Sequence, residues 1–256
     1  MRRYGWMVAV VLLNLPTSAQ QLLWLKLSAE AGMLFNWTDA EFLRYYRQYA
    51  LLPELPTDFP IGEWGGISVR IPIDSTLLLR LSSGLARVRL DHFARQPSED
   101  PLRGGERLIR TLLETRLLPV WVGPEWLPLP GQFATTVHVG VGIVPSFVLW
   151  QEEIRSSIPQ DTRRGGVYIR RWYLRWGIRA AVGTVLGFDI ARRGALLESL
   201  RVEASGAYVP LRSPLLAPLS AQLPMPAEIA SSSYALTNVL LILTFALTLQ
   251  LPVQVY

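Results

Sequence analysis

The sequence contains no cysteine, which excludes disulfide bonds, thiolate nucleophiles and Cys-ligated metal sites. Histidine is nearly as scarce, because the chain has only His92 and His138, and two separated histidines make a poor metal site. Charged residues amount to only 18% of the chain, below the roughly 25% of an ordinary soluble domain. Hydrophobic residues make up 50%. In such a chain either a large fraction of the residues is buried, or apolar residues alternate with polar ones along the sequence.

Long uncharged apolar runs are also missing, except at the two ends of the chain. At the N-terminus two arginines precede the apolar core GWMVAVVLLNL, and the small residues TSA follow shortly after it. This order is typical of a secretory signal peptide. An N-terminal membrane helix is the alternative, but the apolar core is shorter than the about 20 residues that such a helix needs. We therefore expect a signal peptide over residues 1–19 and a mature domain over residues 20–256.

The C-terminal run TNVLLILTFALTLQLPVQVY permits two interpretations. Residues 234–253 carry no charge and approach the length of a transmembrane helix, which is about 20 residues. The same run also alternates, because apolar side chains occupy the odd positions from Val239 to Leu251 while Thr244 and Thr248 lie on even positions. The run is therefore either a helical tail anchor or a β-strand, and the remaining chain decides between them.

Alternation with a period of two dominates that remaining chain and indicates strands. In LLWLKLSAEAGMLFNW the odd positions from Leu23 to Trp37 are all apolar, whereas the even positions are mostly polar. Seven further segments alternate in the same way: 61–74, 77–91, 109–122, 133–149, 168–190, 197–209 and 234–253. With seven segments before it, the C-terminal run is better interpreted as the closing strand.

In two of these segments the orientation of the side chains is less regular or less obvious. In the segment 77–91 the alternation changes phase near Gly84, after which Val88 and Leu90 are the apolar pair, so we expect a β-bulge there. In the segment 109–122 we expect the apolar side chains to face lipid and the charged ones to face the interior. The expected lipid-facing residues are Ile109, Leu113, Leu117 and Trp121.

The connections alternate between long and short. Long links cover residues 38–60, 92–107, 150–166 and 210–232, and shorter ones cover 74–76, 123–132 and 191–196. Transmembrane β-barrels have this organisation, with long outer loops and short turns on the other side. Thr38 and Glu41 form a capping box, which predicts a short helix at about residues 39–51 in the first long link. The sequence therefore predicts an all-β, up-and-down antiparallel transmembrane barrel with a short helix in its first outer loop. We expect eight strands, with ten as the alternative.

The polar faces carry Gly, Ser and Thr between the charges, as suits the narrow interior of a closed barrel. Because isolated charges there would be costly, we expect Arg–Glu networks centred on Glu30, Glu114 and Glu203. The surplus of arginine implies a hydrated interior or bound anions. The expected interior residues are Lys26, Glu30, Arg70, Arg80, Arg110, Glu114, Arg116, His138, Arg171, Arg175, Arg179, Arg201 and Glu203.

These features together resemble the small OmpA-type outer-membrane β-barrels of diderm bacteria. The resemblance covers the mature chain and consists of the signal, the alternating strands, the long and short links and the apolar final strand. It implies location in the outer membrane, contact with outer-membrane lipid, and insertion by the barrel-assembly machinery, which recognises a final strand that ends in an aromatic residue. The final strand here ends in Tyr256, although Pro252 departs from the usual signal.

No constellation of residues predicts catalysis, a cofactor or a metal. His138 shares its expected face with Ser146 and Thr136, but an enzyme acting on lipid needs access to the outside of the barrel. The stretch RRWYLRW mixes bases with aromatics, yet alternation sends the two kinds to opposite faces, so we expect no nucleic-acid partner. We expect a structural or surface-interaction protein with a filled polar interior, which binds any ligand through its outer loops. A narrow anion-preferring pore is the alternative, and a lipid-modifying barrel enzyme is a third hypothesis.

Overall fold

The computed structural model describes residues 22–36, 41–50, 54–56, 61–97, 105–129, 133–156, 164–187, 197–215 and 227–254. The expected signal peptide at 1–19, Thr38 of the capping box and Tyr256 lie outside the described residues. The elements in these ranges are β1 (Leu22–Asn36), α2 (Glu41–Ala50), β2 (Gly62–Pro72), β3 (Leu77–Pro97), β4 (Glu106–Leu117), β5 (Val120–Leu129), β6 (Phe133–Ser156), β7 (Arg164–Gly187), β8 (Leu197–Pro214), α3 (Ala227–Ser231) and β9 (Ser233–Gln254). None of the helices in the described ranges is long and apolar enough to cross a membrane.

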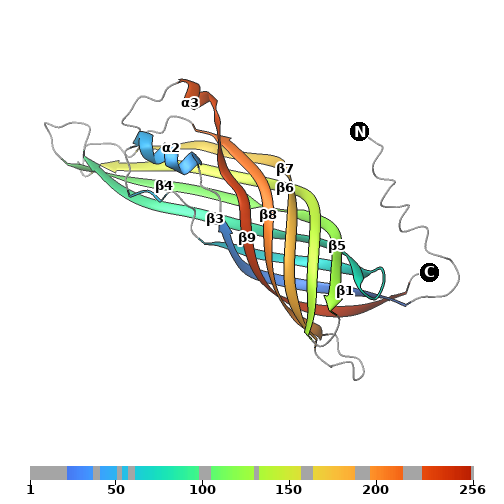
Figure 1. Cartoon of the computed structure of the whole chain (residues 1–256). Helices are drawn as coiled ribbons and strands as arrows, with labels where there is room; N and C mark the ends of the chain where they lie inside the picture. The colour runs from blue at the N-terminus through green and yellow to red at the C-terminus, as the bar shows by residue number, and fades with distance from the viewer. Residues whose placement is uncertain are drawn as a thin grey trace.

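The strands form one antiparallel sheet that closes on itself (Figure 1). Closure is made by β1, which pairs with β2 on one side and with β9 on the other. Both β4 and β5 pair with β3 and β6, so they are two halves of a single barrel strand, interrupted only at Leu118 and Pro119. Two hydrogen bonds bridge the interruption, from Leu118 N–H to the Pro145 carbonyl (2.8 Å) and from Gly84 N–H to the Pro119 carbonyl (3.3 Å). The predicted eight-stranded up-and-down barrel is confirmed.

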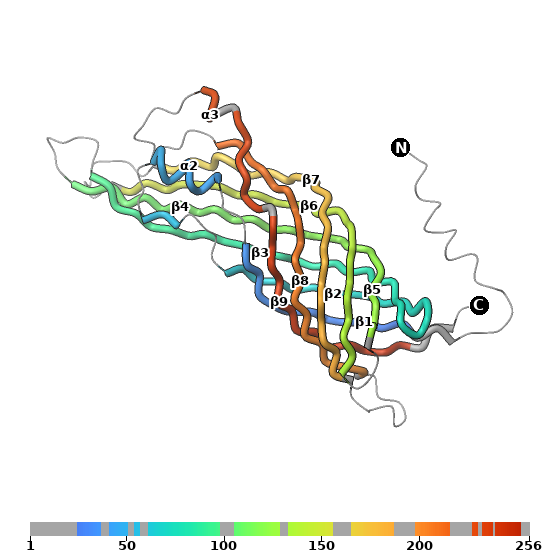
Figure 2. Tube along the Cα trace, in the orientation of Figure 1, coloured from blue at the N-terminus to red at the C-terminus, as the bar shows by residue number. Residues whose placement is uncertain are grey.

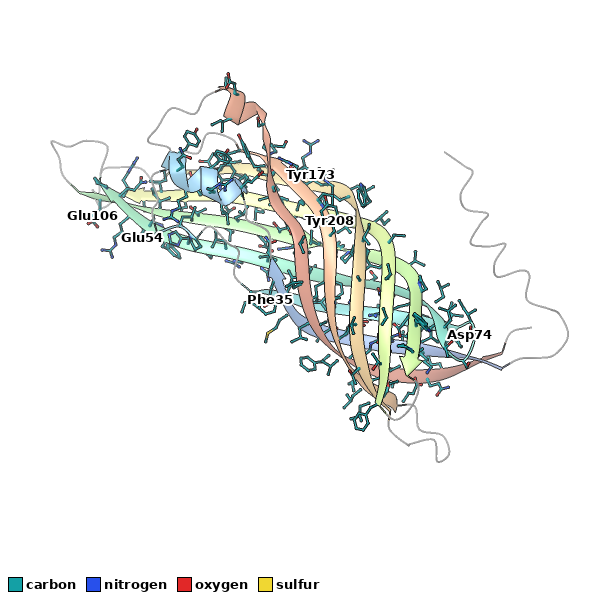
Figure 3. All side chains as sticks on the ribbon, in the orientation of Figure 1. Phe35, Glu54, Asp74, Glu106, Tyr173 and Tyr208 are labelled. Atoms are coloured by element: carbon teal, nitrogen blue, oxygen red, sulfur yellow. The ribbon has the colours of Figure 1, made fainter. Side chains whose placement is uncertain are left out.

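The two ends of the barrel differ, as Figure 3 shows by placing Asp74 at one end and Glu54 and Glu106 at the other. The turn between β2 and β3 is held by the Asp74 carboxylate, which accepts hydrogen bonds from the backbone N–H groups of Thr76 and Leu77 at 2.7 Å each. These donors favour the charged form and lower the pKa of Asp74 below its ordinary value. We call the end with this turn the short-turn end and the opposite end the long-loop end.

The predicted helix is present as α2, which lies across the long-loop end (Figure 1). It forms because its apolar residues recur at helical spacing, and Glu41 in the first turn and Arg47 in the last turn suit the helix dipole. The buried residues of α2 are Phe42, Leu43, Tyr46, Tyr49 and Ala50.

Side chains alternate between the interior and the outer surface along every strand. In β9, Thr244 and Thr248 are buried in the interior, whereas Phe245 and Leu247 are exposed on the outer surface. The C-terminal run is therefore the closing strand, and the interpretation as a helical tail is wrong. Exposed apolar residues on the outer surface include Leu81, Val122, Val139, Val141, Ile143, Trp172, Leu174, Trp176, Val182 and Val202.

The bulge predicted near Gly84 in β3 is wrong. The pairings of β3 with β2 and β4 continue without a register shift, and even-numbered residues face the interior along the whole strand. Val88 and Leu90 are accordingly buried in the interior. The change of sequence pattern has another cause, because at the long-loop end the barrel interior itself is apolar.

Glycines make room for two tryptophans that lie between the polar and the apolar parts of this interior. A Cβ atom added at Gly84 would lie 2.7 Å from the ring of Trp64, and one added at Gly177 would lie 2.6 Å from the ring of Trp121. Both rings are almost fully buried. These glycines therefore allow the two rings to fill the barrel at mid-height.

We expect Gly84→Ala to lower the free energy of unfolding by about 1–3 kcal/mol, because the added methyl group would lie 2.7 Å from both the Trp64 ring and the Gly65 carbonyl oxygen. Gly65→Ala is the matched control on the neighbouring strand, since a Cβ atom there meets nothing within 4 Å. Urea unfolding of the purified barrel in detergent micelles measures both variants. Equal stabilities of the two variants would show that the Trp64 ring and the Gly65 carbonyl both shift enough to accept the extra atom.

Candidate functional site

The polar part of the interior, in the half toward the short-turn end, is organised around Arg80. Its guanidinium donates to Glu30 at 2.7 Å, to Glu203 at 2.6 Å and to Glu125 at 3.3 Å. All four side chains are about 1% exposed. Ions at this depth have lost their hydration, so each must be compensated by charged partners and hydrogen bonds.

Three further arginines complete the network. Arg70 contacts Glu125 at 3.0 Å, Arg179 contacts Glu203 at 2.7 Å, and Arg201 contacts both carboxylates at 2.7 and 2.9 Å. The network therefore has four guanidinium groups and three carboxylates, a net charge of +1. Its N–H groups are not all used, because among the described residues Arg80 Nε, Arg179 Nη1 and Arg201 Nε have no hydrogen-bond partner.

Hydroxyl groups link this network to the barrel wall. Ser28 Oγ lies 2.8 Å from Thr248 Oγ1 and accepts a hydrogen bond from Arg70 at 2.5 Å. Thr136 accepts a bond from Arg201 at 2.7 Å. The small polar residues of the alternating faces therefore leave space for long arginines and also hydrogen-bond them.

His138 lies in the same half and is 1% exposed. Neither ring nitrogen has a hydrogen-bond partner among the described residues. Ser146, on the same face of β6, donates instead to the Val144 carbonyl at 3.0 Å. The structure thus does not join these side chains into a nucleophile–base pair. No group of three or more potential metal ligands occurs among the residues that the structure describes.

Three predicted interior residues lie on the outer surface, which corrects the prediction for β4. Ile109, Leu113 and the other residues expected to face lipid point into the barrel, and Arg110, Glu114 and Arg116 point outward. Glu114 accepts bonds from Arg87 (2.9 Å) and Arg116 (2.5 Å), so it forms a surface ion cluster and is not the centre of an interior network. The reason is that this part of β4 lies beyond the apolar band, where apolar residues face the core as in a soluble protein.

The remaining predicted residues lie toward the two ends. Lys26 pairs with Glu198 at 2.5 Å in a partly exposed site toward the short-turn end. Arg171 and Arg175 lie near the long-loop part of β7, where both guanidinium groups lie near the ring of Tyr173. Arg171 is exposed, so it is not part of the interior network.

Glu125 is the central carboxylate that the sequence analysis missed. It lies in the expected short link 123–132, but residues 123–129 belong to β5, which pairs with β3 and β6. The phase of the alternation did not reveal it, because Trp121, which has the same parity, was expected to face lipid. Glu125 has the same parity as Trp121 and Gly123, and all three face the interior.

The half of the interior toward the long-loop end is apolar and is closed by α2. Trp150 of β6 is fully buried, and its ring centroid lies 5.1 Å from that of Phe42 and 5.2 Å from that of Tyr46. The Tyr46 hydroxyl also hydrogen-bonds Thr111 at 2.8 Å and Glu152. The helix therefore plugs the mouth through both apolar and polar contacts.

Contacts with other strands hold α2 in place. Gln96 of β3 donates to the carbonyl of Ala50 at 2.5 Å, and the backbone N–H of Ala235 in β9 donates to Glu41 at 3.2 Å. Two strands that are separated in the ring by β1 and β2 thus contact the two ends of the helix. The interior has two layers, a charged one toward the short-turn end and an apolar one under α2.

The chain matches no protein-family model and no curated protein. Among solved structures it is similar to the crystal structure of Neisserial surface protein A, with 8% sequence identity and a TM-score of 0.36. The alignment covers 91% of this chain and 99% of that one. A likeness at this identity and TM-score carries no argument about this chain.

Proposed function

We propose that the chain is a β-barrel of the bacterial outer membrane with a structural or surface-interaction role, and that its interior is closed to ions. The observation that carries the proposal is a closed sheet whose outer surface is apolar around the ring. A band of this kind is stable in hydrocarbon, where every backbone group must be hydrogen-bonded within the protein. The antiparallel ring meets that requirement wherever both neighbouring strands pair; between β7 and β8 the pairing covers Ile178–Gly187 and Ser199–Tyr208, and the part of β7 toward the long-loop end pairs with β6 alone.

The two filled layers support the closed state. The charged layer is nearly inaccessible to solvent, and the tryptophans at mid-height together with α2 occupy the rest of the interior. His138 is buried, and its ring nitrogens have no hydrogen-bond partner among the residues that the structure describes, so we assign it no catalytic role in this proposal. The outer loops then remain the place for contacts with other molecules, because binding residues concentrate on loops held by a rigid scaffold.

The experiment is expression in a diderm bacterium, followed by membrane fractionation and gel electrophoresis with and without heating. We expect the protein in the outer-membrane fraction, with a faster mobility before heating than after it, because the folded barrel remains compact in detergent. A protein that alkaline carbonate extracts from the membrane would contradict the proposal.

The same purified protein separates the closed barrel from the anion-preferring pore. The observation that favours the pore is the net positive charge of the interior network and its unused N–H groups. We expect no discrete conductance steps in planar bilayers, whereas a general porin run in parallel gives them. Regular steps with anion preference would favour the pore and overturn the closed state.

A further inference from the structure

A cluster of arginines lies on the outer surface where the apolar band ends. On β3 the exposed residues continue from Leu81 and Leu85 directly to Arg87, and on β4 and β5 they continue from Val120 and Leu118 to Arg116. These strands run side by side toward the long-loop end (Figure 2). Arg87 and Arg116 are direct partners across the two strands. They form the first charged row beyond the band.

The two guanidinium groups are arranged over one buried carboxylate. Both donate through Nε to the same oxygen of Glu114, which is only 4% exposed, whereas the arginines are 36% and 46% exposed. The terminal Nη groups of these partly exposed arginines form no hydrogen bond or ion pair with the described residues. Arg116 also lies over the ring of Phe147 at 5.7 Å, which fixes the plane of its guanidinium. The pair is therefore pre-organised with free donors, the arrangement that binds phosphate oxygens.

The surrounding charge is positive in the two rows nearest to the band. The first row contains Glu63 beside Arg87 and Arg116, and the second contains Arg89, Glu114 and, across β6, Arg170 of β7. The two rows together contain four arginines and two glutamates, which gives a net charge of +2. One row further out, Asp91 accepts bonds from Arg89 and Arg110, and bonding to Arg110 above all lowers its pKa to about 2. Asp91 offsets part of the positive charge of Arg89. Arg87 and Arg116 are therefore the two arginines to which we assign anion binding.

The depth of the pair matches a lipid headgroup. One step of two residues is about 6.6 Å along a strand and about 5 Å along the membrane normal when the strand is tilted by about 35–45°, and this step separates Arg87 from Leu85 and Arg116 from Leu118. The polar interface of a bilayer is about 5–8 Å thick on each side of the hydrocarbon. The guanidinium groups therefore lie at the level of lipid phosphates if the apolar band lies in hydrocarbon.

We propose that Arg87 and Arg116, bridged by Glu114, bind the phosphate group of an anionic lipid in the membrane leaflet on the long-loop side. The inference rests on the proposed membrane insertion. A lipid fits better than a soluble anion because the site continues directly into the exposed apolar surface of Leu85 and Leu118, along which an acyl chain can lie.

The test uses the purified full chain in vesicles of phosphatidylcholine with a minor fraction of phosphatidylglycerol. The measurement is the ratio of the two lipids that remain with the protein after extraction into a nonionic detergent. We expect the wild type to retain an excess of phosphatidylglycerol. In the double variant Arg87→Gln/Arg116→Gln the enrichment should fall by about fivefold for each arginine removed. The double variant Arg87→Lys/Arg116→Lys keeps both positive charges and should keep most of the enrichment. Arg95→Gln, further along β3 and 78% exposed, is the matched control and should behave as wild type.

Glu114→Gln moves the result in the opposite direction, because it removes the charge that both arginines share, and should raise the enrichment. Equal retention by the wild type and the double glutamine variant overturns the inference, and so does loss of the enrichment on addition of inorganic phosphate, which would indicate a site for free anions. If the double glutamine variant does not fold, Glu114→Gln decides, and no rise overturns the inference. Flotation with the vesicles is scored first, so a failure to insert is recognised as failure of the proposed function.

Discussion

Arg80→Met is expected to lower the free energy of unfolding of the barrel by about 3–5 kcal/mol, because it leaves three buried carboxylates without their common cation. Arg80 lies within 3.3 Å of all three, Glu30, Glu125 and Glu203, and the three other arginines of the network do not contact Glu30. Urea unfolding in detergent micelles, followed by tryptophan fluorescence and by the heat-dependent gel shift, measures the loss.

Two variants show whether burial of the network causes this effect. Lys26→Met breaks a pair whose side chains are 28% and 23% exposed, so it should cost no more than about 1 kcal/mol. Arg80→Lys keeps the charge but loses the branched set of donors. Its loss of unfolding free energy should lie between those of Lys26→Met and Arg80→Met. If Arg80→Met and Lys26→Met lose the same amount, the buried network does not stabilise the barrel more than a surface pair does.

Trp150→Ala should release α2 from the mouth of the barrel. The ring is fully buried and lies against Phe42, Tyr46 and Tyr168, so its removal should cost about 3–5 kcal/mol and leave a cavity under the helix. Arg44 is exposed and Arg47 partly exposed in the docked helix, and a released α2 can unfold, so its backbone at these two residues becomes a substrate for trypsin. Limited proteolysis followed by mass spectrometry should detect cleavage in α2 of the variant and protection in the wild type.

Trp172→Ala is the control for this experiment. Its ring is exposed on the outer surface and meets only one described aromatic ring, that of Phe147 at 5.2 Å. The change should cost about 0.5–1.5 kcal/mol and leave α2 protected. Cleavage of α2 at the same rate in the wild type and in both variants would contradict the docked position of the helix.

The strands within the apolar band could be predicted in detail, because there the two faces differ in polarity in one constant sense. In β8, Arg201 and Glu203 point inward and Val202 points outward, as the sequence indicated. Small polar residues between the charges gave the direction of the interior, since a narrow barrel needs both space and hydrogen bonds. The eight-stranded ring follows from such strands and from the lengths of their connections.

Beyond the band the same rule fails, because water replaces lipid as the outer solvent. Leu113 and Glu114 alternate as clearly as Val202 and Glu203 do, but in β4 the leucine is inside. Periodicity shows which side chains share a face and does not show which solvent that face meets. The apparent change of phase in β3 has the same origin. Glu125 was missed because residues 123–132 were expected to form a short link between strands.

The position of α2 has a consequence for the order in which the barrel assembles. Tyr46 contacts residues 65 and 106 positions later in the chain, and Glu41 contacts Ala235, which is 194 positions later. Contacts across such separations form late, because the intervening chain must first be ordered. The strands that α2 contacts include β9, which also closes the ring by pairing with β1. One of the first elements to leave the ribosome is therefore expected to be among the last to reach its native place.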